Sequence, residues 1–401
     1  MEKKKKLLFY SHQSIDKQDI DSVVKVLKGD WLTTGPIVDQ FEKKISEYTG
    51  SRFAVCCSSG TAGLILSYMA LGKNCKNYLI PSMTFVSTVS SASLLGKNID
   101  FVDCNSNNGL IDFIRLENIV KKKKIDVIVP VHMNGKSVEL EKIYKLAKEN
   151  GIFVVDDASH AIGSSYKTSD NKNYKVGSGM HSDMTVFSFH PVKNITTGEG
   201  GAITTNDHNL YQKLINLRNH GIERKKENIK NIERAYNNHG EINSWYYEVQ
   251  DIGYNFRLSD INCALGLSQF KKLDNFKKNR SSIVKKYCSL LKCLDDYITP
   301  VNNPEDENTA WHLFVVKIKF NILKKDKDYF IKELKKKNIQ TQVHYIPVHF
   351  HPFFSKYKSE NLKATEAYYD EILSLPLHPQ MNNKDVEFVV ESIKEVLKNM
   401  L

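Results

Sequence analysis

The sequence predicts an α/β fold, with a mostly parallel sheet in a large domain and a smaller α/β domain after it. Up to about residue 205, short apolar runs rich in β-branched residues alternate with helical stretches. This alternation is typical of a parallel sheet covered by helices. From about Leu273 the chain becomes rich in helix and in lysine. We therefore divide the chain into residues 1–270 and residues 271–401.

Local signals predict the individual elements of both domains. Short apolar runs predict strands of the larger domain at residues 53–57, 78–81, 99–103, 127–131, 153–157, 184–189 and 201–204. In the smaller domain we expect strands near residues 313–318 and 342–344, and helices at residues 328–337 and 385–397. The basic, Asn-rich segment 223–244 lacks clear periodicity and is expected to be a loop, whereas residues 168–174 have the composition of an exposed hairpin tip.

The composition indicates a globular protein and argues against membrane and nucleic-acid-binding proteins. A length of 401 residues with 41% hydrophobic residues is enough for two domains with a substantial core. The apolar runs are far shorter than the roughly 18 residues of a membrane span, so no membrane association is expected. The net charge is +11, but the lysines are scattered and not interleaved with aromatic residues, so we expect no nucleic-acid partner. Seven cysteines without paired spacing, and no signal peptide, predict a cytoplasmic protein.

Lys193 is the most informative residue of the chain. It follows the apolar run at residues 184–189, and a Gly-rich turn leads from it into the next strand. A lysine at a strand end, beside apolar and aromatic neighbours, can lose its proton near neutral pH because desolvation disfavours the ammonium. A neutral amine is what a Schiff base requires. The alternative is an ordinary surface lysine, since Lys and Arg together number 57.

Asp157 ends another predicted strand, and His160 follows it closely. Ligands of parallel sheets bind at the carboxyl ends of the strands, so Asp157 and Lys193 can meet at one edge. A carboxylate and a lysine on either side of a planar ring suit pyridoxal phosphate: the acid keeps the ring nitrogen protonated and the amine bonds the aldehyde. Asp157 can also cap a helix, and the two roles are compatible.

Two further segments fit such a cofactor. Residues 53–66 predict a strand, a small-residue turn and a helix, and amides at a helix N-terminus together with Ser and Thr hydroxyls bind phosphate well. Phe85, just beyond a predicted strand, could stack on a flat cofactor. Read alone, Phe85 is more typical of a hydrophobic core, and many α/β turns resemble the first segment.

Taken in order, these motifs resemble the DegT/StrS sugar-nucleotide aminotransferases, which have the aspartate-aminotransferase (type I PLP) fold. The resemblance covers nearly the whole chain. Its segments are residues 30–36 with Phe41-Glu42, and residues 59–62, 81–85, 156–161, 188–193, 199–201, 253–258 and 375–378.

The resemblance implies a role for each of these residues. Lys193 and Asp157 would be catalytic, and pyridoxal 5'-phosphate would be the cofactor, without a metal. Phe85 would stack on the cofactor ring and His160 would approach its phenolic oxygen. The remaining expected contacts are Gly60, Thr61, Ala62 and Ser188 to the phosphate, Asn255 to the phosphate of a neighbouring subunit's cofactor, and Thr33, His344 and Tyr345 to the substrate. The role of Asn255 implies a homodimer with composite active sites.

Several segments resemble one branch of the family, which acts in pseudaminic acid biosynthesis. They are residues 135–139, 188–197, 311–313 and 342–348. That branch moves an amino group from L-glutamate to C-4 of a UDP-linked 4-keto-6-deoxy N-acetylhexosamine. Three alternatives remain open: another keto-sugar nucleotide (dTDP- or GDP-linked, or aminated at C-3), a sugar dehydratase, and a non-enzymatic regulatory protein on the same fold. Dehydratases of this family carry histidine at the lysine position, so Lys193 argues against the second.

Overall fold

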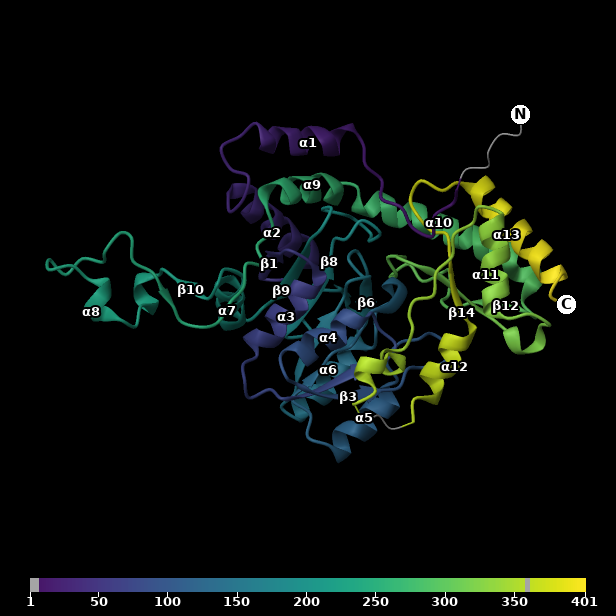
Figure 1. The fold of residues 1–401 in the computed structure, drawn as a ribbon, viewed down its shortest axis with the longest axis horizontal. Coiled ribbons are helices and arrows are strands. Elements are labelled where there is room, and N and C mark those ends of the chain that lie inside the picture. The colour runs from purple at the N-terminus through teal and green to yellow at the C-terminus, as the bar shows by residue number, and fades with distance from the viewer. Residues whose placement is uncertain (1–6, 358–360) are drawn as a thin grey trace.

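The computed structural model describes residues 7–357 and 361–401 and contains a seven-stranded sheet in the order β1-β9-β8-β5-β4-β2-β3 (Figure 1). Its strands are β1 (Phe53–Cys57), β2 (Asn77–Pro81), β3 (Asn98–Val102), β4 (Val127–Ile128), β5 (Phe153–Asp157), β8 (Met184–Ser188) and β9 (Gly201–Thr205). Strands β8, β5, β4, β2 and β3 are parallel, and β9 runs antiparallel to both β1 and β8. The predicted mostly parallel sheet is confirmed. Only β4 is clearly shorter than expected, because Pro130 cannot donate to the ladder.

Both faces of this sheet are covered by helices. Consecutive residues of one strand, such as Leu79 and Ile80, belong to two separate hydrophobic clusters on opposite faces. Strands buried on both faces explain why the sequence shows continuous apolar runs here. The helices around this sheet are α2 (Pro36–Thr49), α3 (Gly60–Ala70), α4 (Val86–Leu94), α5 (Phe113–Lys122), α6 (Leu140–Glu149), α7 (His208–Arg218) and α9 (Asp260–Phe270), with α1 (Lys17–Leu27) lying on α9.

A smaller antiparallel sheet, β12-β13-β14, lies at the other end of the molecule. It comprises β12 (Ile298–Pro300), β13 (Phe314–Ile318) and β14 (Ile372–Leu375), with the helices α10 (Leu273–Leu291), α11 (Lys327–Lys336), α12 (Lys363–Glu371) and α13 (Asn383–Lys398). The strand expected at residues 342–344 is wrong, since only Gln342 pairs, in a single bridge with Ser374. The chain then turns into the wall of a cavity, and β12 and β14 complete the sheet instead. A boundary at residue 270 stays a prediction, because α10 contributes Leu273 to the large core and Tyr287 to the small one.

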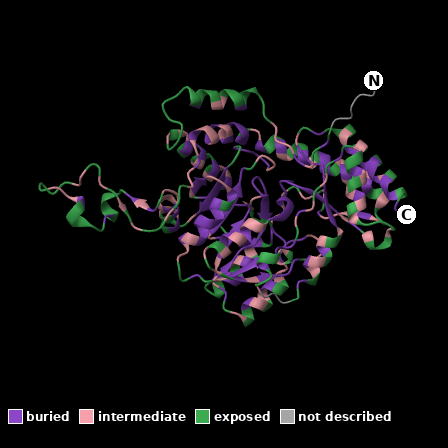
Figure 2. Cartoon of the chain, in the orientation of Figure 1, coloured by how far each residue is buried: buried purple, intermediate pink, exposed green. Residues whose placement is uncertain are grey.

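An arm formed by residues 222–249 projects from the large sheet (Figure 1). The short strands β10 (Ile222–Glu223) and β11 (Glu248–Val249) pair at its base, and α8 (Ile232–Ala235) lies beyond them. Most of the arm is exposed (Figure 2). The predicted hairpin tip is confirmed by β6 (Ser165–Lys167) and β7 (Asn173–Lys175). Single 3-10 turns occur at η1 (Met133–Gly135), η2 (Lys226–Asn228), η3 (Lys292–Leu294), η4 (Phe320–Ile322), η5 (Val348–Phe350) and η6 (Pro352–Phe354). Among the described residues, no helix is both long and apolar enough to cross a membrane.

A buried ion pair fixes the edge strand β1 to two helices. Glu42 on α2 accepts the N–H of Cys56 at 2.8 Å and pairs with Arg218 of α7. The Arg218 guanidinium also donates to the Cys56 carbonyl, at 2.7 Å. Because both side chains are largely buried, each charge depends on the other for compensation.

We expect Glu42→Gln to destabilise the fold by about 3 kcal/mol, because it leaves the Arg218 charge buried without a partner. The measurement is the free energy of unfolding in urea. Glu47→Gln, on the same helix, is the control: Glu47 pairs with Lys43 at 3.9 Å and both side chains are exposed. Its unfolding midpoint should stay at the wild-type value. Equal destabilisation by both substitutions would contradict the role given to the Glu42–Arg218 pair.

Candidate active site

The carboxyl ends of β5 and β8 open into a cavity of about 800 Å³. Asp157 is the last residue of β5 and pairs in parallel register with Val186 of β8. The loop after β8 carries Lys193, so both side chains line this cavity. The other predicted site residues that line it are Gly60, Thr61, Phe85, His160, Ser188, His344 and Tyr345. Residues far apart in the sequence are thus brought to one edge of the sheet.

Lys193 is half-buried and lies on the cavity wall. Burial among protein atoms lowers the pKa of its amine from the ordinary 10.5 to about 8, and the nearby Asp157 carboxylate opposes that shift. A lowered pKa means that the neutral, nucleophilic amine becomes abundant within about one pH unit of neutrality. Such an amine is compatible with the Schiff-base role expected from the sequence, and that role stays a prediction.

The Asp157 carboxylate is held in a fixed orientation by two donors. The Thr88 hydroxyl donates to one oxygen at 2.7 Å, and the Ser159 amide donates to the other at 3.1 Å. Thr88 lies on α4 and is itself in contact with the Thr84 hydroxyl at 2.8 Å. Donors to a carboxylate stabilise its ionised form, which is the form that can hold a protonated ring nitrogen.

The start of α3 forms the opposite end of the cavity. Ser59 caps this helix, and its hydroxyl accepts the amide of Ala62 at 3.0 Å. Gly60 and Thr61 line the cavity, whereas Ala62 does not. Gly201 must be glycine here, since a Cβ would lie 2.5 Å from the Ser59 carbonyl. The predicted phosphate contact of Ala62 stays a prediction, and its amide is already bonded to Ser59.

A group of neutral aromatic side chains closes the cavity on the side of the smaller sheet. His160 contacts the Tyr345 hydroxyl at 2.9 Å, and its ring lies 4.4 Å from that of His312. Burial lowers the pKa of both histidines well below the usual value. His344 contacts the Ser374 hydroxyl at 2.8 Å, and burial lowers its pKa to about 3. These rings are therefore uncharged near neutral pH. Phe85 is 50% exposed, and its ring lies 5.4 Å from Tyr345.

Besides Ala62, two predicted site residues, Thr33 and Asn255, do not line the cavity of their own chain. Thr33 is exposed and forms a bridge with Ser259, and Asn255 is exposed and forms a bridge with Asn219. His349 contacts the Ser82 hydroxyl at 2.6 Å and does not line the cavity either. The functions of Thr33 and Asn255 stay predictions.

Comparison with known proteins agrees with this geometry. Residues 13–394 match the DegT/DnrJ/EryC1/StrS aminotransferase family. The chain belongs to this family.

Individual relatives match over nearly the full length. A UDP-4-amino-4,6-dideoxy-N-acetyl-beta-L-altrosamine transaminase of Campylobacter jejuni is 36% identical over 98% of both chains. The structure of Helicobacter pylori PseC, an aminotransferase involved in the biosynthesis of pseudoaminic acid, aligns with a TM-score of 0.88 at 30% identity, covering 98% of this chain and 100% of that one. The PLP-form of Spr1654 from Streptococcus pneumoniae, described as a sugar aminotransferase, aligns at 0.85 with 26% identity, covering 99% and 100%. The protein is thus a sugar aminotransferase with a type I PLP fold.

The cofactor of this DegT-family enzyme is pyridoxal 5'-phosphate, and the residues present fit it. Three properties of the cavity match three parts of the cofactor: an amine of lowered pKa for the aldehyde, a carboxylate for the ring nitrogen, and a helix N-terminus for the phosphate. His160 adds a ring nitrogen, Nδ1, that is buried and has no partner among the described residues. Such a nitrogen is suited to a polar group of a bound molecule.

Sequence reasoning missed Thr88 and His312 as residues of the site. Thr88 lies just beyond the recognised segment 81–85, four residues after Thr84, and that helical spacing was the available signal for a shared face. Nothing local indicated that this face meets Asp157. His312 was noted only as part of a family segment, because its contact with His160 joins residues 152 positions apart.

We expect Thr88→Val to raise the dissociation constant for pyridoxal phosphate about tenfold, because a hydrogen bond to a charged group contributes about 1.5–3 kcal/mol. Titration of cofactor-free protein, followed by fluorescence, measures this constant. Thr88→Ser keeps the hydroxyl and should bind nearly as tightly as the wild type. Wild-type affinity in Thr88→Val would show that Asp157 does not need this donor.

Proposed function

We propose that this sugar aminotransferase moves the amino group of L-glutamate to C-4 of a UDP-linked 4-keto-6-deoxy N-acetylhexosamine. The observation that carries the proposal is the nearly full-length similarity to two enzymes whose descriptions name this chemistry or its pathway. The amine and the carboxylate in the cavity support aminotransfer itself.

Lys193 and Asp157 are the proposed catalytic residues. With the donor bound, the Lys193 amine would act as the general base that takes a proton from the donor's α-carbon, and then as the general acid that gives it up. In the second half-reaction it moves a proton in the reverse direction, to C-4 of the sugar. Asp157, whose carboxylate accepts hydrogen bonds from Thr88 and Ser159, would bind the protonated ring nitrogen of the cofactor. When bound, pyridoxal phosphate supplies an aldehyde that accepts amino groups and a ring that withdraws electrons from the reacting carbon.

The other proposed contacts divide between cofactor and substrate. Gly60, Thr61 and Ser188 bind the phosphate, at the end of the cavity formed by α3 and β8. Phe85 stacks on the ring, and His160 approaches its phenolic oxygen. On the side of the smaller sheet, His344 and Tyr345 contact the substrate. Because these two side chains are uncharged at neutral pH, they suit hydroxyl and acetamido groups better than an ionised group.

We propose that the enzyme works as a homodimer with composite sites. Asn255 is exposed and outside the cavity of its own chain, so it is free to reach a neighbouring subunit. The nearby arm exposes large apolar side chains, including Trp245 at 70% and Val249 at 61%. Exposed apolar groups of this size are typical of an interface. Thr33 would contact substrate from the same side. The cytoplasmic location stays a prediction.

The substrate is tested by offering the enzyme glutamate and a panel of sugar nucleotides. The panel contains UDP-linked 4-keto sugars of L-arabino and D-xylo configuration, a dTDP-linked 4-keto sugar and a 3-keto isomer. We expect kcat/KM for one of the UDP-linked 4-keto sugars to exceed that for the others by at least about tenfold, because buried polar groups discriminate strongly against a mismatched substrate. Product NMR identifies the aminated carbon.

The possible results test the substrate and the aminotransferase activity separately. A preference for the dTDP-linked or 3-keto sugar would replace the substrate and keep the aminotransferase. Lys193→Ala is the matched control and should lose turnover with every substrate, since no other amine takes its place. Turnover near the wild-type rate in that variant would remove Lys193 from the mechanism.

Composite sites predict complementation between inactive variants. Lys193→Ala and Asn255→Ala subunits, mixed and allowed to exchange, should form heterodimers with one intact site and recover up to about a quarter of wild-type activity by random pairing. Exchange is verified by native mass spectrometry with one subunit isotopically labelled. Full exchange without recovered activity would argue that each site is built from one chain.

A further inference from the structure

Asn194, the residue after Lys193, has a buried side chain that joins two distant segments. Its amide group donates one hydrogen bond to the Ile162 carbonyl at 3.0 Å and another to the Ala310 carbonyl at 3.1 Å. Ile162 belongs to the loop after β5, and Ala310 belongs to the segment that leads into β13. A carboxamide is well suited to this position, because its NH₂ group supplies two donors from one neutral nitrogen.

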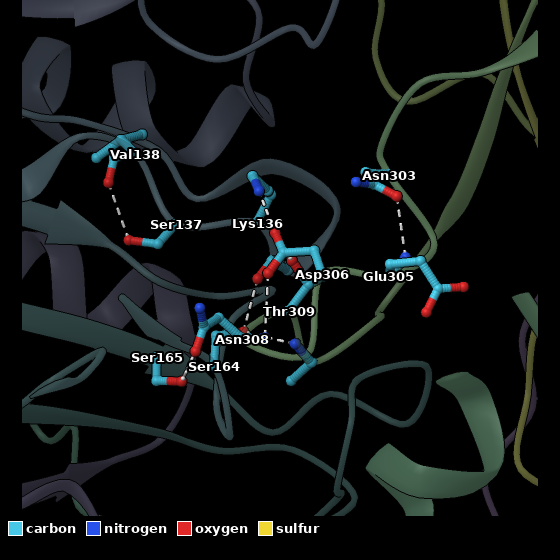
Figure 3. A network of polar contacts seen from close by, with 12 residues as sticks. Lys136, Ser137, Val138, Ser164, Ser165, Asn303, Glu305, Asp306, Asn308 and Thr309 are labelled. Carbon is cyan, nitrogen blue, oxygen red and sulfur yellow. Dashed lines mark hydrogen bonds and ion pairs between the residues drawn. The ribbon is translucent and has the colours of Figure 1, made fainter. Parts of the chain in front are cut away.

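The Ala310 carbonyl is held in place independently of Asn194. Figure 3 shows the polar network around residues 303–309, where Asp306 forms an ion pair with Lys136 and accepts the Thr309 hydroxyl at 3.1 Å. The Ala310 amide donates to the Ser164 hydroxyl at 2.9 Å. Gly135 must be glycine, since a Cβ there would lie 2.1 Å from the Ala310 oxygen. This segment is therefore a firm attachment point.

Helix α10 contacts the same loop from another side. The buried Arg280 guanidinium lies 3.4 Å from the carbonyl oxygens of both Lys193 and Asn194. The main chain at Lys193 is thus in contact with α10, and through Asn194 with the loop after β5 and the segment before β13. By contrast, the Lys193 amine itself has no hydrogen-bond partner among the described residues. Its position is consequently set by the main chain that carries it.

We propose that Asn194 is a positioning residue for Lys193: its two hydrogen bonds hold the loop so that the amine faces Asp157 in a water-poor part of the cavity. This inference rests on the proposed role of Lys193 as the reactive amine. Without these bonds the loop would separate from Ile162 and Ala310, and water would reach the amine. Because water favours the ammonium, the pKa of Lys193 would rise toward its ordinary value.

The other charged groups near Lys193 do not change when Asn194 is replaced. Asp157 faces the amine from β5, and Arg280 lies beneath the loop on α10. His160, His312 and His344, which line the cavity with Lys193, have pKa values far below neutrality and so stay uncharged. His190 and Glu199 lie on the same loop as Lys193 and also line the cavity. A change in the pKa of Lys193 in an Asn194 variant would therefore report the hydration and position of the amine.

The test measures that pKa directly in cofactor-free, full-length protein. The rate of acetylation of Lys193 by acetic anhydride is followed against pH by peptide mass spectrometry. We expect the pKa to rise from about 8 in the wild type by about one unit in Asn194→Ala, because burial of the amine is reduced. In the cofactor-loaded enzyme kcat should fall about 100-fold with little change in KM, since misplacing a reacting group impairs the chemical step.

Asn262→Ala is the matched control. The Asn262 amide also donates to a carbonyl of this loop, that of Thr197 at 2.6 Å, but from α9 and four residues away from Lys193. Loss of that bond should leave the pKa of Lys193 and kcat near wild-type values. Asn194→Ser, which keeps one donor, should give an intermediate shift, and it provides a measurement if Asn194→Ala does not fold.

An unchanged pKa of Lys193 in the Asn194 variants, or an equal shift in Asn262→Ala, would overturn the positioning role. The proposed role of Lys193 as the reactive amine is tested by a separate experiment. Borohydride reduction of the loaded enzyme, followed by peptide mapping, should place the cofactor on Lys193. Attachment elsewhere would reject the assignment of Lys193 whatever the acetylation rates are.

Discussion

The parallel pairing of β5 with β8 is the constraint on which the candidate site depends. It places Asp157 opposite Val186, so that the loop after β8 begins beside the carboxylate. The antiparallel strand β9 then returns next to β8, and Gly201 lets it approach the start of α3 closely. The pairing of β5, β8 and β9 therefore sets the distances between the Lys193 amine, the Asp157 carboxylate and the N-terminus of α3.

The ionisable groups at this edge of the sheet are stabilised in different ways. These differences leave one of them, the Lys193 amine, reactive. The Asp157 carboxylate accepts two hydrogen bonds, at 2.7 and 3.1 Å, whereas the Arg280 guanidinium makes two longer contacts to carbonyl oxygens, at 3.4 Å. The histidines become neutral instead, because burial disfavours their charged form. If a partner stabilised the ammonium form of Lys193 completely, no neutral, reactive amine would be present near neutral pH. Burial without full compensation is therefore what makes this amine reactive.

Much of the large sheet could be predicted from sequence, because strands buried on both faces produce continuous apolar runs. Lys193 and Asp157 stand directly after such runs and could be predicted with them. Strands β12 and β14 could not, since they are only three and four residues long and lack the extended apolar runs of the large sheet. Thr88 and Asn194 were missed for a related reason. Their polar side chains have no local pattern, and their importance comes from contacts with residues 69 and 116 positions away.

The core of the smaller domain contains residues from both ends of the chain. Leu8 belongs to its hydrophobic cluster and accepts the amide of Gln340, while the amide of Leu377 donates to the Tyr10 carbonyl. During synthesis, residues near Leu8 emerge long before residues near Ile339 and must remain unpaired while the large sheet is made. The pairing of Leu8 with Ile339 therefore requires the chain to be synthesised to beyond residue 339. Residues 342–345, which line the cavity, follow this pairing directly, so the cavity wall and the pairing of the two ends of the chain share one segment.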